Sequence, residues 1–428
     1  MAKINEILTN SINFKTEAQL RGEQIANKAA LPLLSVAGLT MLVLGPYGML
    51  VILNSSVGNL TNIVGSVGTL NYLNIASKSG ILIKDGEALE SFKKVDTVLF
   101  DKTGTLTEEE PNIAQIVTSE NSQYNKDEIL KFAAAAEQKL SHPIARTIVK
   151  EAQEHGLELP ELGDSSYQLG RGITVKIGEK TVQVGSRQFM DKEDIDIPAL
   201  FLKAMSAAHE QGHSLVFIAI DQKLEGAIEL QATIRPEIPG IIAGLRKRGI
   251  KKIAIVSGDH KQPTENLAQL LKVDAYFHDV LPEQKADIVT QLQDEGNIVC
   301  FVGDGINDAI AMKKADVSVS LKGASSIATD AAQVVFMDGT LRNLSKMFDI
   351  SRDLNSNLST SLNMMLIPFG LNILGTYTAG LSLAAAILFK QTCFLGGLGY
   401  VMLPSKSTKY LRQEQKKLKQ VQEAEETA

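Results

Sequence analysis

Two long stretches without charge constrain the fold of this chain more than any other feature. Residues 29–77 contain no Asp, Glu, Lys or Arg, and residues 354–405 contain one charged residue, Lys390. A helix needs about 20 apolar residues to cross a bilayer, so each stretch is long enough for two spans and a turn. We expect Gly45-Pro46 to divide the first stretch and residues 376–380 to divide the second. The sequence therefore predicts two transmembrane helical hairpins.

The four ends of these hairpins face the same side of the membrane, because each hairpin crosses and returns. The loops on that side are rich in lysine and arginine, which is typical of a cytoplasmic face: Lys78, Lys84, Lys93, Lys94, Lys406, Lys409 and Arg412. We expect an integral protein of the cell membrane, with the lipid bilayer as partner and the soluble domains in the cytoplasm. Hydrophobic helices buried in a soluble protein are the alternative, but the charge-free length argues against them.

Charge and cysteine content exclude two other classes of protein. The chain has 43 Lys and Arg against 49 Asp and Glu, a net charge of −6. Because no basic excess is available to neutralise phosphates, we expect no nucleic-acid partner. The two cysteines, Cys300 and Cys393, lie far apart in the sequence. They provide neither a disulfide framework nor a paired-cysteine zinc site.

The stretch between the hairpins, residues 78–353, has the pattern of a soluble α/β protein. Apolar, β-branched segments at 95–100, 252–256 and 298–302 predict buried parallel strands. Each segment is followed within three residues by an aspartate: Asp101, Asp259 and Asp304. Because ligands bind at the carboxyl ends of the strands in such sheets, we expect the three aspartates to converge on one site.

Converging carboxylates repel each other unless a cation lies among them, and Mg²⁺ suits such an oxygen-only cage. An aspartate can also attack phosphorus and form an aspartyl phosphate. Asp101 is the candidate, because the turn Thr103-Gly104-Thr105 leaves donors for phosphate oxygens. Lys285 would supply positive charge to the transferred group. Taken alone, this lysine has the alternative of a solvated helix face.

These segments resemble the phosphorylation-domain motifs of P-type ATPases, which are haloacid-dehalogenase-like proteins. The motifs are DKTGTLT at 101–107, SGD at 257–259, LPEQK at 281–285 and GDGIND at 303–308, in the same order as in the family. The resemblance implies that ATP phosphorylates Asp101 and that Mg²⁺ is bound by Asp101, Asp304 and the carbonyl of Thr103. It implies roles around the phosphate and the metal for the other motif residues: Lys285, Ser257, Gly258, Asp259, Asn307 and Asp308.

The insertion at residues 111–234 is expected to be an α+β nucleotide-binding domain. A predicted helix ending at Glu137, then His142-Pro143, then Gly170-Arg171-Gly172 are similar to features of the heavy-metal branch of the family. The resemblance implies that ATP binds at Glu137, His142, Gly170 and Gly172. Singly, a His-Pro pair is usually a helix start and a GxG is usually a turn, so the prediction depends on their order after DKTGTLT.

The membrane region departs from the family. The family has a Cys-Pro-Cys or similar motif in the span before DKTGTLT, and counting back from residues 80–83 places it near residues 57–59. This chain has polar residues there but no cysteine, proline, histidine or carboxylate: Asn54, Ser55, Ser56 and Asn59. Two interpretations of this polar segment stay open: a cation site and a surface for helix packing. We expect Lys390 to face this segment in place of a transported ion, or to exclude metal from it; snorkelling to a lipid headgroup is the alternative.

Residues 1–28 resemble the last helix of an actuator domain leading into a span. The TGE loop that positions water to hydrolyse the aspartyl phosphate is not found in the sequence. From the resemblance we expect slow turnover of the phosphoenzyme, with a separate chain as a candidate source of the actuator domain. Two further departures concern ATP affinity and domain coupling: Ser186 replaces a common asparagine, and Ala232 replaces a hinge aspartate.

The predicted fold is a membrane protein with two helical hairpins, a cytosolic haloacid-dehalogenase-like α/β domain and an inserted nucleotide-binding domain. Its layout is an actuator-like tail (1–28), a hairpin (29–77), a phosphorylation domain in two parts (78–110 and 235–353) around the insertion (111–234), a hairpin (354–405) and a charged cytosolic tail (406–428). The predicted function is ATP-driven transport of a cation, of the metal class by resemblance. The alternatives are a truncated or regulatory half-transporter that binds ATP without completing transport and, disfavoured by the nucleotide motifs, a membrane-anchored phosphatase.

Overall fold

The computed structural model describes residues 17–56, 58–108, 110–119, 122–140, 142–160, 165–168, 172–304, 306–323 and 326–403. Some predictions lie outside the described residues: the first part of the tail 1–28, the tail 406–428 and Gly170. The side chain of Asn59 also lies outside them.

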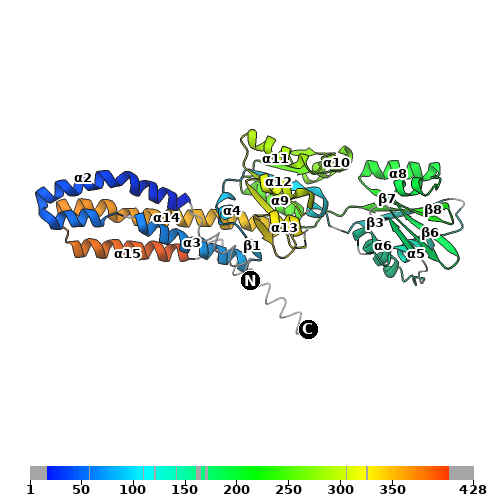
Figure 1. Cartoon of the computed structure of the whole chain (residues 1–428), viewed down its shortest axis with the longest axis horizontal. Coiled ribbons are helices and arrows are strands. Elements are labelled where there is room, and N and C mark those ends of the chain that lie inside the picture. The colour runs from blue at the N-terminus through cyan, green and yellow to red at the C-terminus, as the bar shows by residue number, and fades with distance from the viewer. Residues whose placement is uncertain are drawn as a thin grey trace, which may run out of the picture. The chain divides into compact units, whose positions relative to one another are not determined.

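The membrane region is a bundle of long helices that lie side by side (Figure 1). They are α2 (Glu17–Asn54), α3 (Gly58–Lys78), α14 (Asn343–Thr378) and α15 (Leu383–Met402). Three helical segments of the described chain are long and apolar enough to cross a membrane: Ala26–Asn54, Asn343–Thr378 and Leu383–Met402. Helix α3 is long enough but not apolar enough to meet the same criterion, because four asparagines and two threonines lower its mean hydropathy. The predicted fourth span therefore remains a prediction.

The first hairpin reverses inside α2, which consists of two helices joined at Gly45. This glycine has φ 74° and ψ −171°, a backbone conformation that residues with a Cβ rarely adopt. Ala37, before the turn, packs in one cluster with Ile52, after it. In a continuous helix these two residues would be about 22 Å apart along the axis. The chain thus reverses at the predicted Gly45-Pro46 turn (Figure 1).

After this turn the helix is interrupted a second time. It ends at Asn54 and resumes as α3 at Gly58. The motif position predicted from the sequence is residues 57–59, so the interruption at Ser55 and Ser56 lies directly before that segment.

The second hairpin joins α14 to α15. Helix α14 ends at Thr378, and the Ser382 hydroxyl accepts a hydrogen bond from the Ala385 amide at the start of α15. The turn therefore lies at residues 379–382, slightly later than the predicted 376–380. Helix α14 begins at Asn343, before the charge-free stretch that starts at residue 354. This helix continues the soluble domain into the membrane region without a break.

A seven-stranded sheet forms the predicted α/β domain, in the order β1-β13-β12-β11-β2-β9-β10. Its strands are β1 (Ile81–Ile83), β2 (Thr97–Asp101), β9 (Lys252–Val256), β10 (Ala275–Phe277), β11 (Val299–Val302), β12 (Val317–Leu321) and β13 (Val334–Phe336). The helices around it are α4 (Gly86–Ser91), α9 (Ile238–Lys247), α10 (Lys261–Leu271), α11 (Gln284–Asp294), α12 (Ala309–Lys314) and α13 (Ser326–Ala331), with short turns η1 (Lys102–Leu106) and η2 (Ile306–Asp308). The three predicted strands are β2, β9 and β11. They lie next to one another in the sheet, in the order β11-β2-β9.

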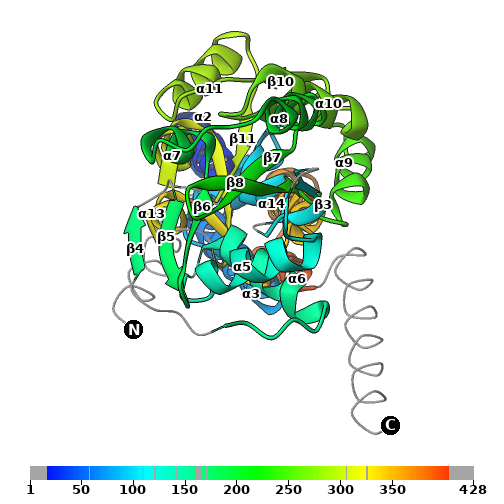
Figure 2. The same ribbon diagram turned by 90° about the vertical axis from the view of Figure 1, so that its right-hand side faces the viewer.

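The inserted domain has a six-stranded antiparallel sheet in the order β3-β8-β7-β6-β5-β4. Its strands are β3 (Asn112–Thr118), β4 (Ser165–Gln168), β5 (Gly172–Ile177), β6 (Lys180–Gly185), β7 (Ser214–Ile220) and β8 (Lys223–Gln231). Helices α5 (Lys126–Glu137) and α6 (Pro143–Glu154) cover one face, and α8 (Ala199–Gln211) covers the other together with α7 (Arg187–Lys192) (Figures 1 and 2). Each face thus has its own apolar core.

Candidate active site

Asp101 is the last residue of the fully buried strand β2 and is itself 6% exposed. The Lys285 ammonium, from the start of α11, lies 2.5 Å from Asp101 Oδ1, and both side chains are buried. A buried charge needs a partner, and these two groups partner each other. The structure excludes the solvated-face alternative for Lys285, since only 7% of this residue is exposed.

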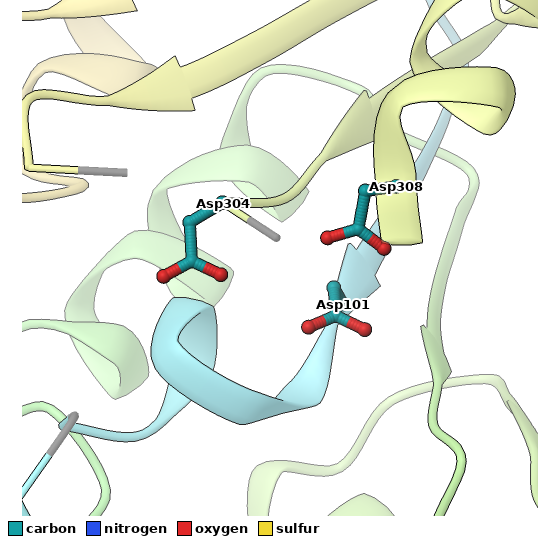
Figure 3. A group of neighbouring side chains, drawn as sticks. All are labelled: Asp101, Asp304 and Asp308. Carbon is teal, nitrogen blue, oxygen red and sulfur yellow. The ribbon is translucent and has the colours of Figure 1, made fainter. Parts of the chain in front are cut away.

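Asp304 and Asp308 approach Asp101 from the segment after β11. Carboxylate oxygens of the three residues all lie within 4.8 Å of one another (Figure 3). Their approach needs Gly303, because a Cβ there would lie 2.7 Å from Asp308 Oδ2. Three clustered carboxylates repel each other and offer only oxygen ligands, which is the donor set that Mg²⁺ prefers. The residues present therefore fit Mg²⁺, with Asp308 as a ligand candidate that was first assigned a supporting role.

A second ion pair lies beside the first. Lys102 pairs with Asp259 of the SGD segment, and Ser257 Oγ accepts a hydrogen bond from the Asp259 amide at 3.0 Å. Burial lowers the pKa of Lys102, and the neighbouring Asp101 carboxylate opposes that shift. Lys102 was not predicted as a site residue, although its position directly after Asp101 was a usable signal.

The turn after Asp101 is held by Arg235. Its guanidinium donates from Nη2 to the Gly104 carbonyl at 2.7 Å and from Nε to the Thr107 carbonyl at 3.3 Å. Thr107 also forms a bridge with Ile234, where the chain returns from the inserted domain. The turn after Asp101 is therefore fixed to the segment that returns from the inserted domain.

A cavity of about 1000 Å³ adjoins this turn. Its lining includes Lys102, Thr103, Gly258, Asp259, His142 and Ala232. A cavity of this size suits a nucleotide-sized ligand. His142 and the phosphate motifs are thus brought together, whereas Glu137 and Gly172 are not among the described residues that line the cavity.

Glu137 nevertheless contacts His142, which does line the cavity. His142 caps α6, since its Nδ1 accepts a hydrogen bond from the Ala145 amide at 3.2 Å. This places the proton of the neutral ring on Nε2, which lies 3.1 Å from Glu137 Oε2. Burial raises the pKa of Glu137 to about 7, while burial and the nearby Arg146 lower the pKa of His142. Both groups are therefore neutral over part of the range around pH 7.

Gly172 has a structural explanation that the sequence did not reveal. A Cβ at this position would lie 2.5 Å from the Phe189 ring and 2.7 Å from the Val184 carbonyl oxygen. Packing of α7 on β5 therefore requires glycine, so its presence alone is no evidence of contact with a nucleotide.

Three further histidines line the cavity: His209, His213 and His260. His209 and His213 have the HExxH spacing of a zinc motif. Helix α8 ends at Gln211, however, and Gly212 follows with φ 82°, so the two histidines do not share a helix face. His213 instead pairs with buried Glu229, with 2.5 Å between Nδ1 and Oε1. No sequence motif pointed to this pair.

In the membrane region, Lys390 lies against the polar segment, as predicted. Its ammonium donates to the carbonyl oxygens of Asn54 at 2.7 Å and of Ser56 at 2.6 Å. The Ser55 hydroxyl donates to the Val51 carbonyl at 3.0 Å, so it is used within its own helix.

Comparison with known proteins supports the arrangement described above. The haloacid dehalogenase-like hydrolase family matches residues 95–316. A copper-exporting P-type ATPase of Legionella pneumophila is 34% identical over 319 residues, covering 74% of this chain and 42% of that protein. A zinc-exporting P-type ATPase of Mycobacterium marinum is 29% identical over 344 residues, covering 79% of this chain and 46% of that protein. The chain thus spans less than half the length of these relatives.

A solved structure covers more of the chain. The crystal structure of a zinc-transporting PIB-type ATPase in the E2.Pi state has a TM-score of 0.73 and 25% identity. The match covers 94% of this chain and 66% of that one. It therefore includes the membrane helices as well as the soluble domains.

Proposed function

Because the chain belongs to the haloacid dehalogenase-like hydrolase family and is homologous to heavy-metal P-type ATPases, we propose that it couples phosphorylation of Asp101 by ATP to cation transport across a membrane. It is an integral membrane protein with its catalytic domains in the cytoplasm. The observation that carries the proposal is the Asp101 carboxylate at the sheet edge, 2.5 Å from Lys285 and clustered with Asp304 and Asp308.

The proposed chemical step is a phosphoryl transfer. An Asp101 carboxylate oxygen attacks the γ-phosphorus, the bond to the bridging oxygen breaks, and ADP leaves with the electron pair. The Lys285 ammonium binds a phosphoryl oxygen and offsets the added negative charge. Mg²⁺ held by Asp101, Asp304 and Asp308, with the carbonyl of Thr103 as a further ligand, would supply charge neutralisation.

The cavity is the proposed ATP site. Lys102, Thr103 and Gly258 line its part next to Asp101, and His142 lines its part in the inserted domain. We place the triphosphate near the first group and the base near His142. Glu137 acts through the Nε2 of His142, because the two side chains contact each other at 3.1 Å. Ser257 and Asp259 shape the phosphate end, and Gly172 serves packing.

The transported ion is proposed to be a heavy or transition metal, since the relatives are named as copper and zinc exporters. Those names favour transport over a regulatory half-transporter. An actuator domain on a separate chain, as well as the roles of Asn307 and Gly170, stay predictions of the resemblance.

Transport by the full chain in sealed vesicles tests this proposal. We expect uptake of Cu⁺ or Zn²⁺ that requires Mg-ATP and is lost in Asp101→Asn. Asp287→Asn, an exposed aspartate on the same helix as Lys285, should transport as the unmodified chain does. Uptake that persists in Asp101→Asn would refute the proposal.

A further inference from the structure

The second interruption of the first hairpin exposes backbone carbonyls inside the membrane region. Helix α2 ends at Asn54, and α3 starts at Gly58. The last carbonyls of a helix have no intrahelical partner and carry the negative end of its dipole. Broken helices in transporters bind cations with such carbonyls. The break is therefore a site of negative potential without any carboxylate.

Lys390 reaches this break from the other hairpin. It is the eighth residue of α15, about 11 Å along the axis from Leu383, which is deep within an apolar layer about 30 Å thick. Its ammonium lies 2.7 Å from the Asn54 carbonyl oxygen and 2.6 Å from the Ser56 carbonyl oxygen. The contact joins segments more than 330 residues apart in the sequence.

The charge of Lys390 has no acidic partner in these stretches. Residues 29–77 and 354–405 contain no aspartate or glutamate. An ionisable group at such depth is expensive unless polar groups solvate it. The two carbonyl oxygens supply that solvation, and the ammonium in turn neutralises the end of α2. The Lys390 ammonium and the carbonyl end of α2 therefore stabilise each other.

We propose that the Lys390 ammonium is a tethered cation that fills the helix break, so that a mobile cation binds there only in its absence. This inference goes beyond the proposed function and does not place the transported metal at the break. An ammonium is monovalent and binds carbonyl oxygens. The break is therefore suited to a monovalent or hard cation rather than to a thiolate-bound soft metal.

Cation binding to the full chain in detergent tests this directly, with Tl⁺ as the probe at saturating Mg²⁺. The unmodified chain and Lys390→Arg, which keeps a tethered cation, should bind no Tl⁺ at the break. Lys390→Met should gain about one Tl⁺ per chain. Lys28→Met, an exposed lysine before the first span, is the matched control and should gain none. Equal Tl⁺ binding by the Met and Arg variants would overturn the proposal.

A cross-link tests the position of the side chain independently of cation binding. In a Cys393→Ala background, Lys390→Cys and Ser56→Cys should be joined by a short bismaleimide in membranes. A cysteine at 390 that reacts with a membrane-impermeant maleimide, without cross-linking to position 56, would place Lys390 at the headgroups and overturn the inference. Neither experiment needs phosphorylation, so failure of the proposed function is distinguishable from failure of this inference.

Discussion

Two lysines show how differently the two regions of this molecule accommodate a positive charge. In the phosphorylation domain, Lys285 lies 2.5 Å from the carboxylate of Asp101, beside two more aspartates. In the membrane region, the hydrogen bonds of Lys390 to described residues go to the backbone carbonyl oxygens of Asn54 and Ser56. The Lys285 charge belongs to the proposed site for the phosphoryl group and Mg²⁺. The Lys390 charge is offset by the end of a helix.

The difference shows which features depend on side-chain identity. The sheet-edge site depends on particular carboxylates and one ammonium, so single substitutions there should act on chemistry. The helix break depends on backbone geometry, so any residue that keeps a cation at position 390 should preserve it. The predictions below test this contrast, starting with the largest expected effect.

Lys285→Ala should reduce the rate of phosphoenzyme formation by about 10²–10³, the usual loss when one stabilising donor is removed from a transferring group. Rapid quench with labelled ATP measures this rate. Lys313→Ala, on the short helix α12, is the matched control and should retain the rate of the unmodified chain. A loss below tenfold for Lys285→Ala would remove this lysine from the chemistry.

Gly303→Ala should disturb the carboxylate cluster without removing a ligand. Its Cβ would lie 2.7 Å from Asp308 Oδ2 and 2.8 Å from the Phe301 ring, and such overpacking costs about 1–3 kcal/mol. We expect weaker Mg²⁺ dependence of phosphorylation, seen as a higher Mg²⁺ concentration for half-maximal labelling. Gly296→Ala, with open space at its Cβ position but φ 86°, controls for backbone strain alone. An unchanged Mg²⁺ requirement in Gly303→Ala would contradict the proposed role of Asp308.

His142→Ala should weaken ATP binding by about 1–3 kcal/mol if a buried polar contact is lost. This substitution also removes the cap of α6. His142→Asn separates the two roles, because asparagine is a good N-cap but lacks Nε2. Calorimetry on the full chain should find both variants weakened. If only His142→Ala binds ATP weakly, the histidine is a helix cap and no more.

The smallest expected effect is a pH dependence of ATP binding. The pKa of Glu137 is raised to about 7 by burial, so its carboxyl loses a proton as the pH rises through 7. The new negative charge behind the cavity should weaken binding of anionic ATP by a few-fold between pH 6 and pH 8. Glu137→Gln stays neutral and should remove this step. A step of the same size in Glu137→Gln would assign it to another group.

The sheet-edge site was predictable from sequence because its chemistry is local. Asp101 and Asp304 each follow a buried strand, and their strands are neighbours in the sheet. Asp259 was expected to join them, but it pairs with Lys102 and is not in the carboxylate cluster. The turn at Gly45 was predictable for the same reason, since one glycine before a proline ends an apolar helix. These elements depend on short segments whose conformations are fixed by their own residues.

Other features depend on contacts between distant segments, which no short motif encodes. The grouping of Asp308 with Asp101 depends on how the turn after β11 folds back, and the requirement for Gly172 comes from Phe189 on a later helix. The start of α14 at Asn343 could not be predicted from the charge-free stretch, because loss of charge marks a membrane boundary and not a helix end. The carbonyl ligands of Lys390 are backbone atoms, so side-chain identities alone did not name them.

The measurement that tests the central claim most directly is acid-stable labelling of the full chain with γ-labelled ATP and Mg²⁺. The account predicts a phosphoenzyme that hydroxylamine cleaves, as expected for an aspartyl phosphate, with Asp101 as the modified residue in peptide mass spectra. It predicts no label in Asp101→Asn and normal label in Asp287→Asn. Label that persists in Asp101→Asn, or that maps to a different residue, would contradict it.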